Sequence, residues 1–155
     1  MNKYLLFGII LIPTYGQNQF SERPLQPATP IIIEKAIDNH VDNIAETIKH
    51  VETGGNYNAK GDSGEIGAYQ ILGATWKGMA GNIPMTPVNQ DLVVKKELKR
   101  LVVSKGYSVA DIALKWNQGH RGACRRGVNS KGVRYDSCGY KDKVLNEYYK
   151  RIATS

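Results

Sequence analysis

The sequence predicts a mainly α-helical domain, and three observations support this fold class. Apolar residues recur at helical spacing in several segments, most clearly at positions 41, 44, 45, 48 and 51. Strand-like alternation of apolar and polar residues is scarce along the chain. The 155 residues are 41% hydrophobic and 23% charged, which is ordinary for a globular protein. This length leaves room for a single domain.

The first 16 residues have the order of a secretory signal peptide. Lys3 provides a positive start, residues 4–12 are apolar, and Pro13 and Gly16 supply a breaker and a small residue before a cut. An apolar segment of this length is too short to cross the bilayer core of about 30 Å as a helix. A buried N-terminal strand is the alternative. The signal predicts an exported protein, periplasmic or extracellular at the cell wall, without a transmembrane segment in its mature form.

Residues 17–39 are expected to form a linker. The segment is polar and contains Pro24, Pro27 and Pro30, which favour an extended chain. Residues 31–33 are a run of isoleucines that either docks on the domain or begins its first helix. The globular domain is then expected to cover residues 40–155.

The first helix of the domain is expected over residues 41–53. Asp42 or Asn43 is a candidate cap at its start, and the glycine pair at 54 and 55 favours its end. Glu52 therefore falls in the last turn of an amphipathic helix, beside its buried face. A carboxyl group in that position is partly desolvated, and desolvation raises its pKa toward the range of a general acid. A solvated glutamate that closes a helix is the alternative.

Four further helices are expected downstream. A short helix is predicted around residues 75–79, and a longer one over 89–104 that stops at Gly106. Ser108 can cap the next helix together with Asp111, in a weaker version of the capping box, and that helix ends at residues 117–119. The last helix is expected at about 141–152.

Residues 120–136, between the last two helices, form a basic, glycine-rich segment that we expect to be a loop. Cys124 and Cys138 flank it, and their spacing without a nearby histidine cluster does not resemble a zinc site. In an oxidising compartment the two cysteines can form one disulfide, worth about 3 kcal/mol for a loop of this size. Two free thiols are the alternative.

The positive charge is concentrated in the second half of the chain. The net charge is +7 overall, and residues 91–155 contain 15 Lys and Arg against 6 Asp and Glu. A basic half favours polyanionic partners, namely nucleic acid, anionic lipid or anionic cell wall, or it is simply a solubilising face. Aromatic residues do not interleave with these charges in a nucleic-acid-binding pattern, so no specific nucleic acid is expected.

Three motifs carry the strongest functional signal. They are Glu-Thr-Gly-Gly-Asn-Tyr-Asn-Ala at 52–59, Gly-Glu-Ile-Gly-Ala-Tyr-Gln at 64–70, and Ala-Leu-Lys-Trp-Asn-Gln-Gly at 113–119. In content and order they resemble motifs of the goose-type lysozyme and soluble lytic transglycosylase superfamily. The resemblance covers residues 44–150, and it implies a lysozyme-like single domain with a sugar-binding cleft.

The resemblance also implies roles for individual residues. Glu52 would be the sole catalytic carboxyl group, Gln70 would line the sugar cleft, and Asn117 would hydrogen-bond the substrate. Tyr69, beside Gln70, would bind substrate in the same cleft. The alternatives are a surface glutamine at 70 and an asparagine that caps the helix at 117.

Two positions depart from the family pattern. Trp116 stands where the family usually has tyrosine, and its indole N–H can donate to Glu52 but cannot accept. Trp116 is therefore either a substrate-binding residue or part of the core. Glu65 replaces a small apolar residue, so it either faces the cleft as a base or electrostatic stabiliser, or it is a solvated loop charge.

The function implied by this resemblance is lytic cleavage of the MurNAc-GlcNAc bond in peptidoglycan, with 1,6-anhydro-MurNAc as product and Glu52 as acid and then base. A hydrolytic lysozyme and a catalytically silent glycan-binding module are the alternatives. No cofactor is required, and His40, His50 and His120 are too scattered to indicate a metal site. The expected partners are peptidoglycan glycan strands, with a secretion or conjugation apparatus as one biological setting. We expect a monomer.

Overall fold

The computed structural model describes residues 30–128, 132 and 134–154. Within these residues the chain is mainly α-helical, as the sequence predicts. The signal-like residues 1–16 and linker residues 17–29 lie outside the described part. Among the described helices, none combines the length and the apolar character needed to cross a membrane.

Helix α1 (Pro30–Thr53) begins about eleven residues earlier than the sequence pattern predicts. The extended linker is therefore wrong for residues 30–39, which are helical. Asp42 and Asn43 lie inside the helix and do not cap it. Pro30 suits a first helical turn because its ring fixes φ near the helical value and its missing N–H has no partner to lose there. The isoleucine run at 31–33 begins this helix and is exposed.

The middle of the chain forms a small hairpin and two helices. Strands β1 (Glu65–Ile66) and β2 (Ile71–Leu72) pair antiparallel, and α2 (Gly73–Ala80) follows directly. Thr86 caps α3 (Pro87–Lys99) by accepting a hydrogen bond from the N–H of Asn89, and the π-helical turn η1 (Arg100–Ser104) continues it. Both helices that were expected in this region are present.

The last third of the chain contains α4, a second hairpin and α5. Helix α4 (Val109–Gln118) begins with the expected capping box of Ser108 and Asp111, and ends at Gly119 in the left-handed conformation. Strands β3 (Arg126–Val128) and β4 (Arg134–Asp136) pair antiparallel where a loop was expected. Helix α5 (Ser137–Ala153) starts earlier than predicted because Asp136 caps it, accepting from the N–H of Gly139.

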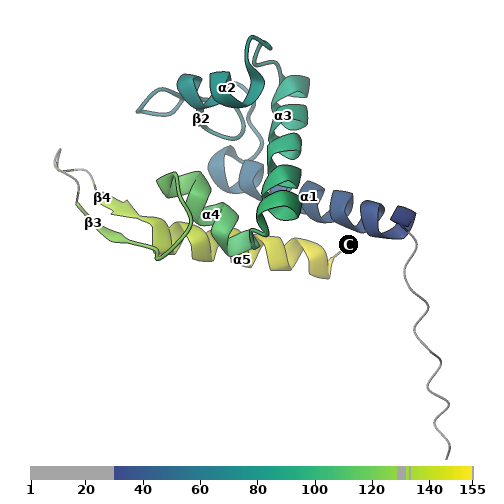
Figure 1. The fold of residues 1–155 in the computed structure, drawn as a ribbon. Coiled ribbons are helices and arrows are strands. Elements are labelled where there is room, and N and C mark those ends of the chain that lie inside the picture. The colour runs from purple at the N-terminus through teal and green to yellow at the C-terminus, as the bar shows by residue number, and fades with distance from the viewer. Residues whose placement is uncertain (1–29, 129–131, 133, 155) are drawn as a thin grey trace, which may run out of the picture.

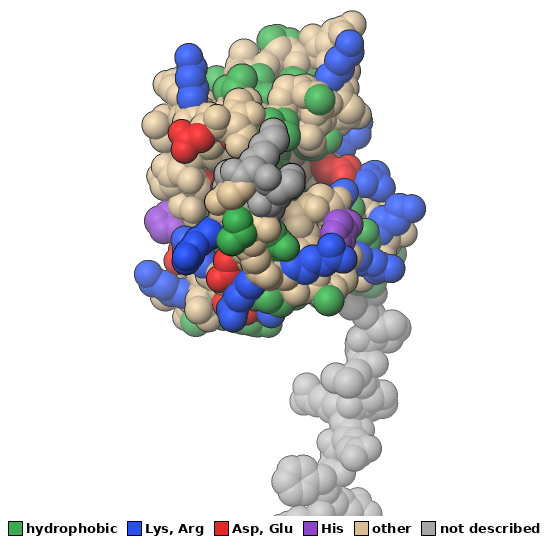
Figure 2. Space-filling model, turned by 90° about the vertical axis from the view of Figure 1, so that its left-hand side faces the viewer, with side chains coloured by type: hydrophobic (Ala, Val, Ile, Leu, Met, Phe, Trp, Pro, Cys, Tyr) green, Lys and Arg blue, Asp and Glu red, His purple; other side chains and the backbone are tan. Residues whose placement is uncertain are grey.

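The helices pack around α1 (Figure 1). Helix α5 contacts α1 and α4, α3 crosses α1, and α2 with the first hairpin lies at the far end of α3. In the second view, Lys and Arg side chains are numerous around the lower part of the molecule (Figure 2). The core is a single apolar cluster at the junction of these helices, with Ile44, Ile48, Tyr69, Val94, Leu98, Leu101, Ile112 and Val144 among its most buried members.

Candidate active site

The end of α1 places Glu52 where the sequence predicts it. The helix stops because Gly54 adopts φ +65°, a left-handed conformation that costs little without a Cβ atom, and its N–H bonds to the carbonyl of His50 at 2.9 Å. Glu52 thus lies in the final turn and is half-buried. Its neighbour Thr53 donates from Oγ1 to the carbonyl of Ala68 at 2.9 Å, which ties the helix end to the hairpin region.

Among the described residues, the carboxylate of Glu52 has one side-chain hydrogen-bond partner, Tyr140. The hydroxyl of Tyr140 donates to Oε1 of Glu52 at 2.5 Å. Tyr140 lies in the first turns of α5, so this hydrogen bond joins the end of one helix to the start of another. Tyr140 was not predicted from the sequence, because no local pattern relates two residues 88 positions apart.

Burial raises the pKa of Glu52, and this is the largest effect on the group. The hydrogen bond from Tyr140 opposes the rise, because it stabilises the ionised form. Repulsion by the charge of Glu65 raises the pKa further, and attraction by Lys143 lowers it. The net result is a carboxyl group that holds its proton at higher pH than an ordinary glutamate, as a general acid requires.

Four of the expected site residues share one groove of ≈ 510 Å³ near Glu52. Glu65, Gln70, Trp116 and Asn117 all line it, together with apolar residues from β2, α2 and η1. Glu52 is not among the lining residues; Glu65 is the groove residue that interacts with it electrostatically. The groove therefore approaches the candidate acid from the side of the first hairpin.

Glu65 and Gln70, which both line the groove, place one side-chain oxygen each close to Gly61. A Cβ added at Gly61 would collide with Oε2 of Glu65 and with Oε1 of Gln70, so both oxygens lie over that glycine. Gln70 is held by a hydrogen bond from its Nε2 to the carbonyl of Gly67 at 2.9 Å, and it has φ +50°. A left-handed conformation at a non-glycine residue costs about 1–3 kcal/mol and is often found at functional sites. Oε2 of Glu65 already accepts a hydrogen bond from the N–H of Ser63 at 3.0 Å.

Trp116 does not donate to Glu52 as expected, and Tyr69 does not face the groove. The indole N–H of Trp116 donates to the backbone carbonyl of Tyr69 at 3.0 Å, so the expected donation to Glu52 is wrong. Tyr69 is fully buried, and its hydroxyl donates to Oδ1 of Asp91 at 2.7 Å. Tyr69 is therefore a core residue and has no surface to offer a substrate. Trp116 still presents part of its ring to the groove.

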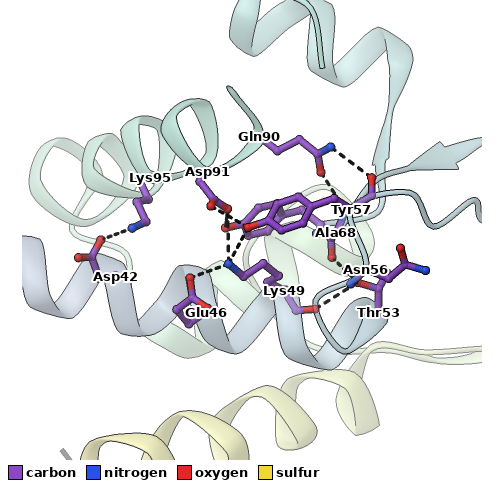
Figure 3. Close-up of polar contacts among 11 residues, drawn as sticks. Asp42, Glu46, Lys49, Thr53, Asn56, Tyr57, Ala68, Gln90, Asp91 and Lys95 are labelled. Carbon is purple, nitrogen blue, oxygen red and sulfur yellow. Dashed lines mark hydrogen bonds and ion pairs between the residues drawn. The ribbon is translucent and has the colours of Figure 1, made fainter. Parts of the chain in front are cut away.

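A polar network beneath the first hairpin was not predicted from the sequence (Figure 3). Asp91 accepts hydrogen bonds from the hydroxyls of Tyr57 and Tyr69, each at 2.7 Å. Lys49 donates to Tyr57 at 3.0 Å and pairs with Glu46 at 2.7 Å and with Asp91 at 3.5 Å. These contacts lower the pKa of Asp91 despite its burial. The network fixes α1, α3 and the hairpin relative to one another.

Gly67 makes room for a second support of the hairpin. The side chain of Gln90, which is almost fully buried, accepts from the N–H of Ala68 at 2.9 Å. A Cβ at Gly67 would collide with the amide of Gln90, and Gly67 has φ +82°. Both conditions explain why glycine occupies this position of the motif.

The second hairpin is fastened to the start of α5, close to Tyr140. Cys124 and Cys138 form the expected disulfide. Ser137 donates from Oγ to the carbonyl of Arg125 at 3.0 Å and accepts from the N–H of the same residue at 2.7 Å. These contacts fix the first turn of the helix that carries Tyr140.

No protein-family model, curated protein or solved structure matches this chain. Among the described residues there is also no group of three or more His, Cys, Asp and Glu side chains arranged to hold a metal ion.

Proposed function

We propose that this chain is a peptidoglycan lytic transglycosylase with a lysozyme-like domain, in which Glu52 is the general acid and then the general base. The observation that carries the proposal is the half-buried carboxyl group of Glu52, whose pKa burial raises and whose Oε1 is held by Tyr140. The adjacent groove supports it, because amide, carboxylate, indole and apolar groups are the surfaces that bind sugars.

The proposed reaction begins with protonated Glu52. It gives its proton to the oxygen that links N-acetylmuramic acid to N-acetylglucosamine, and the bond from this oxygen to C1 of the muramyl residue breaks. The N-acetyl group of the same residue shields the positive charge that develops on its ring. Ionised Glu52 then removes the proton from the C6 hydroxyl, whose oxygen closes the 1,6-anhydro ring on C1. No water is consumed, and Glu52 ends protonated.

In this mechanism, Tyr140 stabilises Glu52 during the interval in which it is ionised. A hydrogen bond to a charged group contributes about 1.5–3 kcal/mol. Burial favours the protonated acid at the start, whereas Tyr140 limits the cost of its ionised form after the first proton transfer. The two effects together suit a residue that must both lose and regain a proton.

Hydrolysis by the same site is the second candidate, and Glu65 is the observation that favours it. Its charge interacts with Glu52, and it lines the groove together with Gln70. A second carboxylate near the reacting bond can activate water, as it does in glycosidases with two acidic residues. The product would then be a reducing sugar with no anhydro ring.

The deciding experiment is digestion of purified peptidoglycan by the wild type and by Glu52→Gln, followed by mass measurement of the products. We expect anhydro-muropeptides from the wild type and at least a thousandfold loss of activity in Glu52→Gln. Lytic activity that survives the substitution would dismiss Glu52 as the acid. Reducing ends without anhydro products would replace the transglycosylase with the hydrolase. A folded wild type that binds glycan but never cleaves it would indicate a binding module.

A further inference from the structure

A second groove is lined by chain neighbours of Glu52 and Tyr140. It has a volume of ≈ 600 Å³ and lies between the last turns of α1 and the outer face of α5. Val51 and Gly139, the chain neighbours of Glu52 and Tyr140, line the end nearest the candidate acid. The groove continues along α5 to Lys150. Lys150 follows Gly139 by eleven positions in the helix, which corresponds to a rise of about 16 Å along its axis.

The unpaired charges of this groove are positive. Lys143 and Lys150 line it and have no ion pair with any residue that the structure describes. The two acidic residues that line it are paired elsewhere, Asp142 with Lys141 at 3.2 Å and Glu147 with Arg151 at 3.5 Å. The groove therefore presents two free ammonium groups, and the amide of Asn146 and the imidazole of His50 line it as well.

The position of Lys143 connects this groove to the chemistry proposed for Glu52. Its charge is close enough to lower the pKa of Glu52. A ligand that extends from the reacting sugar in this direction would meet Lys143 first and Lys150 farther along α5. The two grooves are lined by different residues, and each contains a residue whose charge acts on Glu52, Glu65 in the first and Lys143 in the second. The first is lined by apolar, amide and charged residues, among them Glu65, Glu97 and Lys115. In the second, the two lysines have no ion pair among the described residues, whereas both acidic residues have one.

We infer that the second groove binds the peptide stem of peptidoglycan through its carboxylates. The inference rests on the proposed function, because the stem is attached to the lactyl group of the muramyl residue that Glu52 would act on. The stem carries free carboxylates, which complement the ammonium groups of Lys143 and Lys150. An extended peptide advances about 3.3 Å per residue, so the length of the groove accommodates about five residues.

The test measures binding separately from cleavage. The probes are glycan strands with intact stems and the same strands after an amidase has removed the stems. Both are bound to Glu52→Gln, which we expect to retain the fold, so that binding is measured without degradation. The comparison variants carry Lys143→Gln and Lys150→Gln in this background, singly and together. Lys105→Gln is the matched control, because it removes an exposed charge that lines neither groove and has no ion pair with a described residue.

We expect stem-bearing strands to bind more tightly than bare strands. Each lysine substitution should weaken binding of the stem-bearing strands by about threefold, the range of an exposed ion pair, and the two together by about tenfold. The preference for stems should disappear in the double variant, and Lys105→Gln should keep it. Equal binding of both strands by the parent protein would overturn the inference. So would an equal loss for both strands in the lysine variants, which would indicate general attraction to polyanions.

Failure of the proposed function would give a different result. If the wild type cleaved neither strand but binding still depended on the stem and on the two lysines, stem binding by the groove would be supported and the proposed enzymatic activity would be rejected. If the wild type cleaved both strands at equal rates and bound them equally, the enzymatic activity would be supported and stem binding by the groove would be rejected.

Discussion

The hydroxyl of Tyr140 donates a hydrogen bond of 2.5 Å to Oε1 of Glu52, across 88 residues of sequence. It joins the last turn of α1 to the first turns of α5 and fixes one oxygen of the candidate acid. The other oxygen has no side-chain hydrogen bond among the described residues. Tyr140 thus distinguishes the two oxygens of one carboxyl group.

Replacing Tyr140 with phenylalanine should reduce lytic activity and shift its pH dependence. The hydrogen bond from Tyr140 lowers the pKa of Glu52, so its loss should raise that pKa further. Activity that needs protonated Glu52 would then persist to higher pH, and the alkaline limb of kcat/KM should move upward. The rate on the plateau should fall about tenfold or more, because ionised Glu52 loses a charged hydrogen bond. Tyr149→Phe, at an exposed position of α5, is the control.

Glu65→Gln should move the same limb in the opposite direction. Glu65 raises the pKa of Glu52 by repulsion, so an uncharged residue at 65 should lower that pKa and shift the alkaline limb of kcat/KM to lower pH. Product masses from the same variant test its chemistry. If Glu65 activates water, the fraction of reducing ends falls; if it only binds sugar, KM rises and the product ratio is unchanged. An unmoved pH profile would contradict the electrostatic contact.

Glu52→Gln should be more stable than the wild type at neutral pH, and this difference should disappear at acidic pH. Burial raises the folded-state pKa of Glu52, so its protonated form favours folding fully below the unfolded pKa, and this contribution is lost as pH rises through the folded pKa. Glutamine at this position does not ionise, so the variant keeps its stability as the pH rises. Urea unfolding of both proteins at about pH 4 and pH 8 should show a difference only at the higher pH. A difference that is the same at both pH values would contradict burial of the charge.

The helices that bury one apolar face could be predicted from the sequence. The end of α1 and all of α4 carry apolar residues at helical spacing and clear boundary residues, and both are where the pattern places them. The first turns of α1 were missed because the isoleucines at 31–33 are exposed, so they give no amphipathic stripe. Strands β3 and β4 were missed for a related reason: all six of their residues are exposed, and no alternation marks them.

The site was predictable only as far as its motifs extend. Glu52, Gln70 and Asn117 could be named because each stands in a short pattern. Tyr140 stands in none, and its role depends on how α5 packs against α1. The partner of Trp116 was wrong because a donor's target depends on side-chain direction, which spacing does not report.

Loss of the disulfide should destabilise the protein and affect the site through α5. Changing both Cys124 and Cys138 to serine should lower the free energy of unfolding by about 2–3 kcal/mol, since the bond closes a loop of 14-residue separation. Ser137 still holds the first turn of α5 through Arg125, so Tyr140 should stay near Glu52. Denaturant unfolding and lytic assays of the double variant check both expectations. Complete loss of activity in a folded variant would show that the disulfide positions Tyr140.

Gly67→Ala should be among the most damaging substitutions outside the catalytic group. The added methyl group would collide with the amide of Gln90 and would occupy a backbone with φ +82°. The left-handed conformation costs an L-residue about 1–2 kcal/mol. Displacing Gln90 leaves the N–H of Ala68 without its buried partner, which costs about 1–3 kcal/mol more. The free energy of unfolding should therefore fall by about 2–5 kcal/mol, as measured by denaturant titration.

The matched control for Gly67→Ala is Gly78→Ala. Gly78 lies inside α2 with open space where its Cβ would be, and its φ is not positive. Alanine there should stabilise the protein by about 0.5–1 kcal/mol, because glycine weakens a helix interior. If Gly78→Ala lowered the free energy of unfolding as much as Gly67→Ala, the loss at position 67 could not be assigned to the collision with Gln90 and the left-handed backbone. The damage at 67 should also reach the groove, because Gln70 depends on the carbonyl of Gly67 for its hydrogen bond.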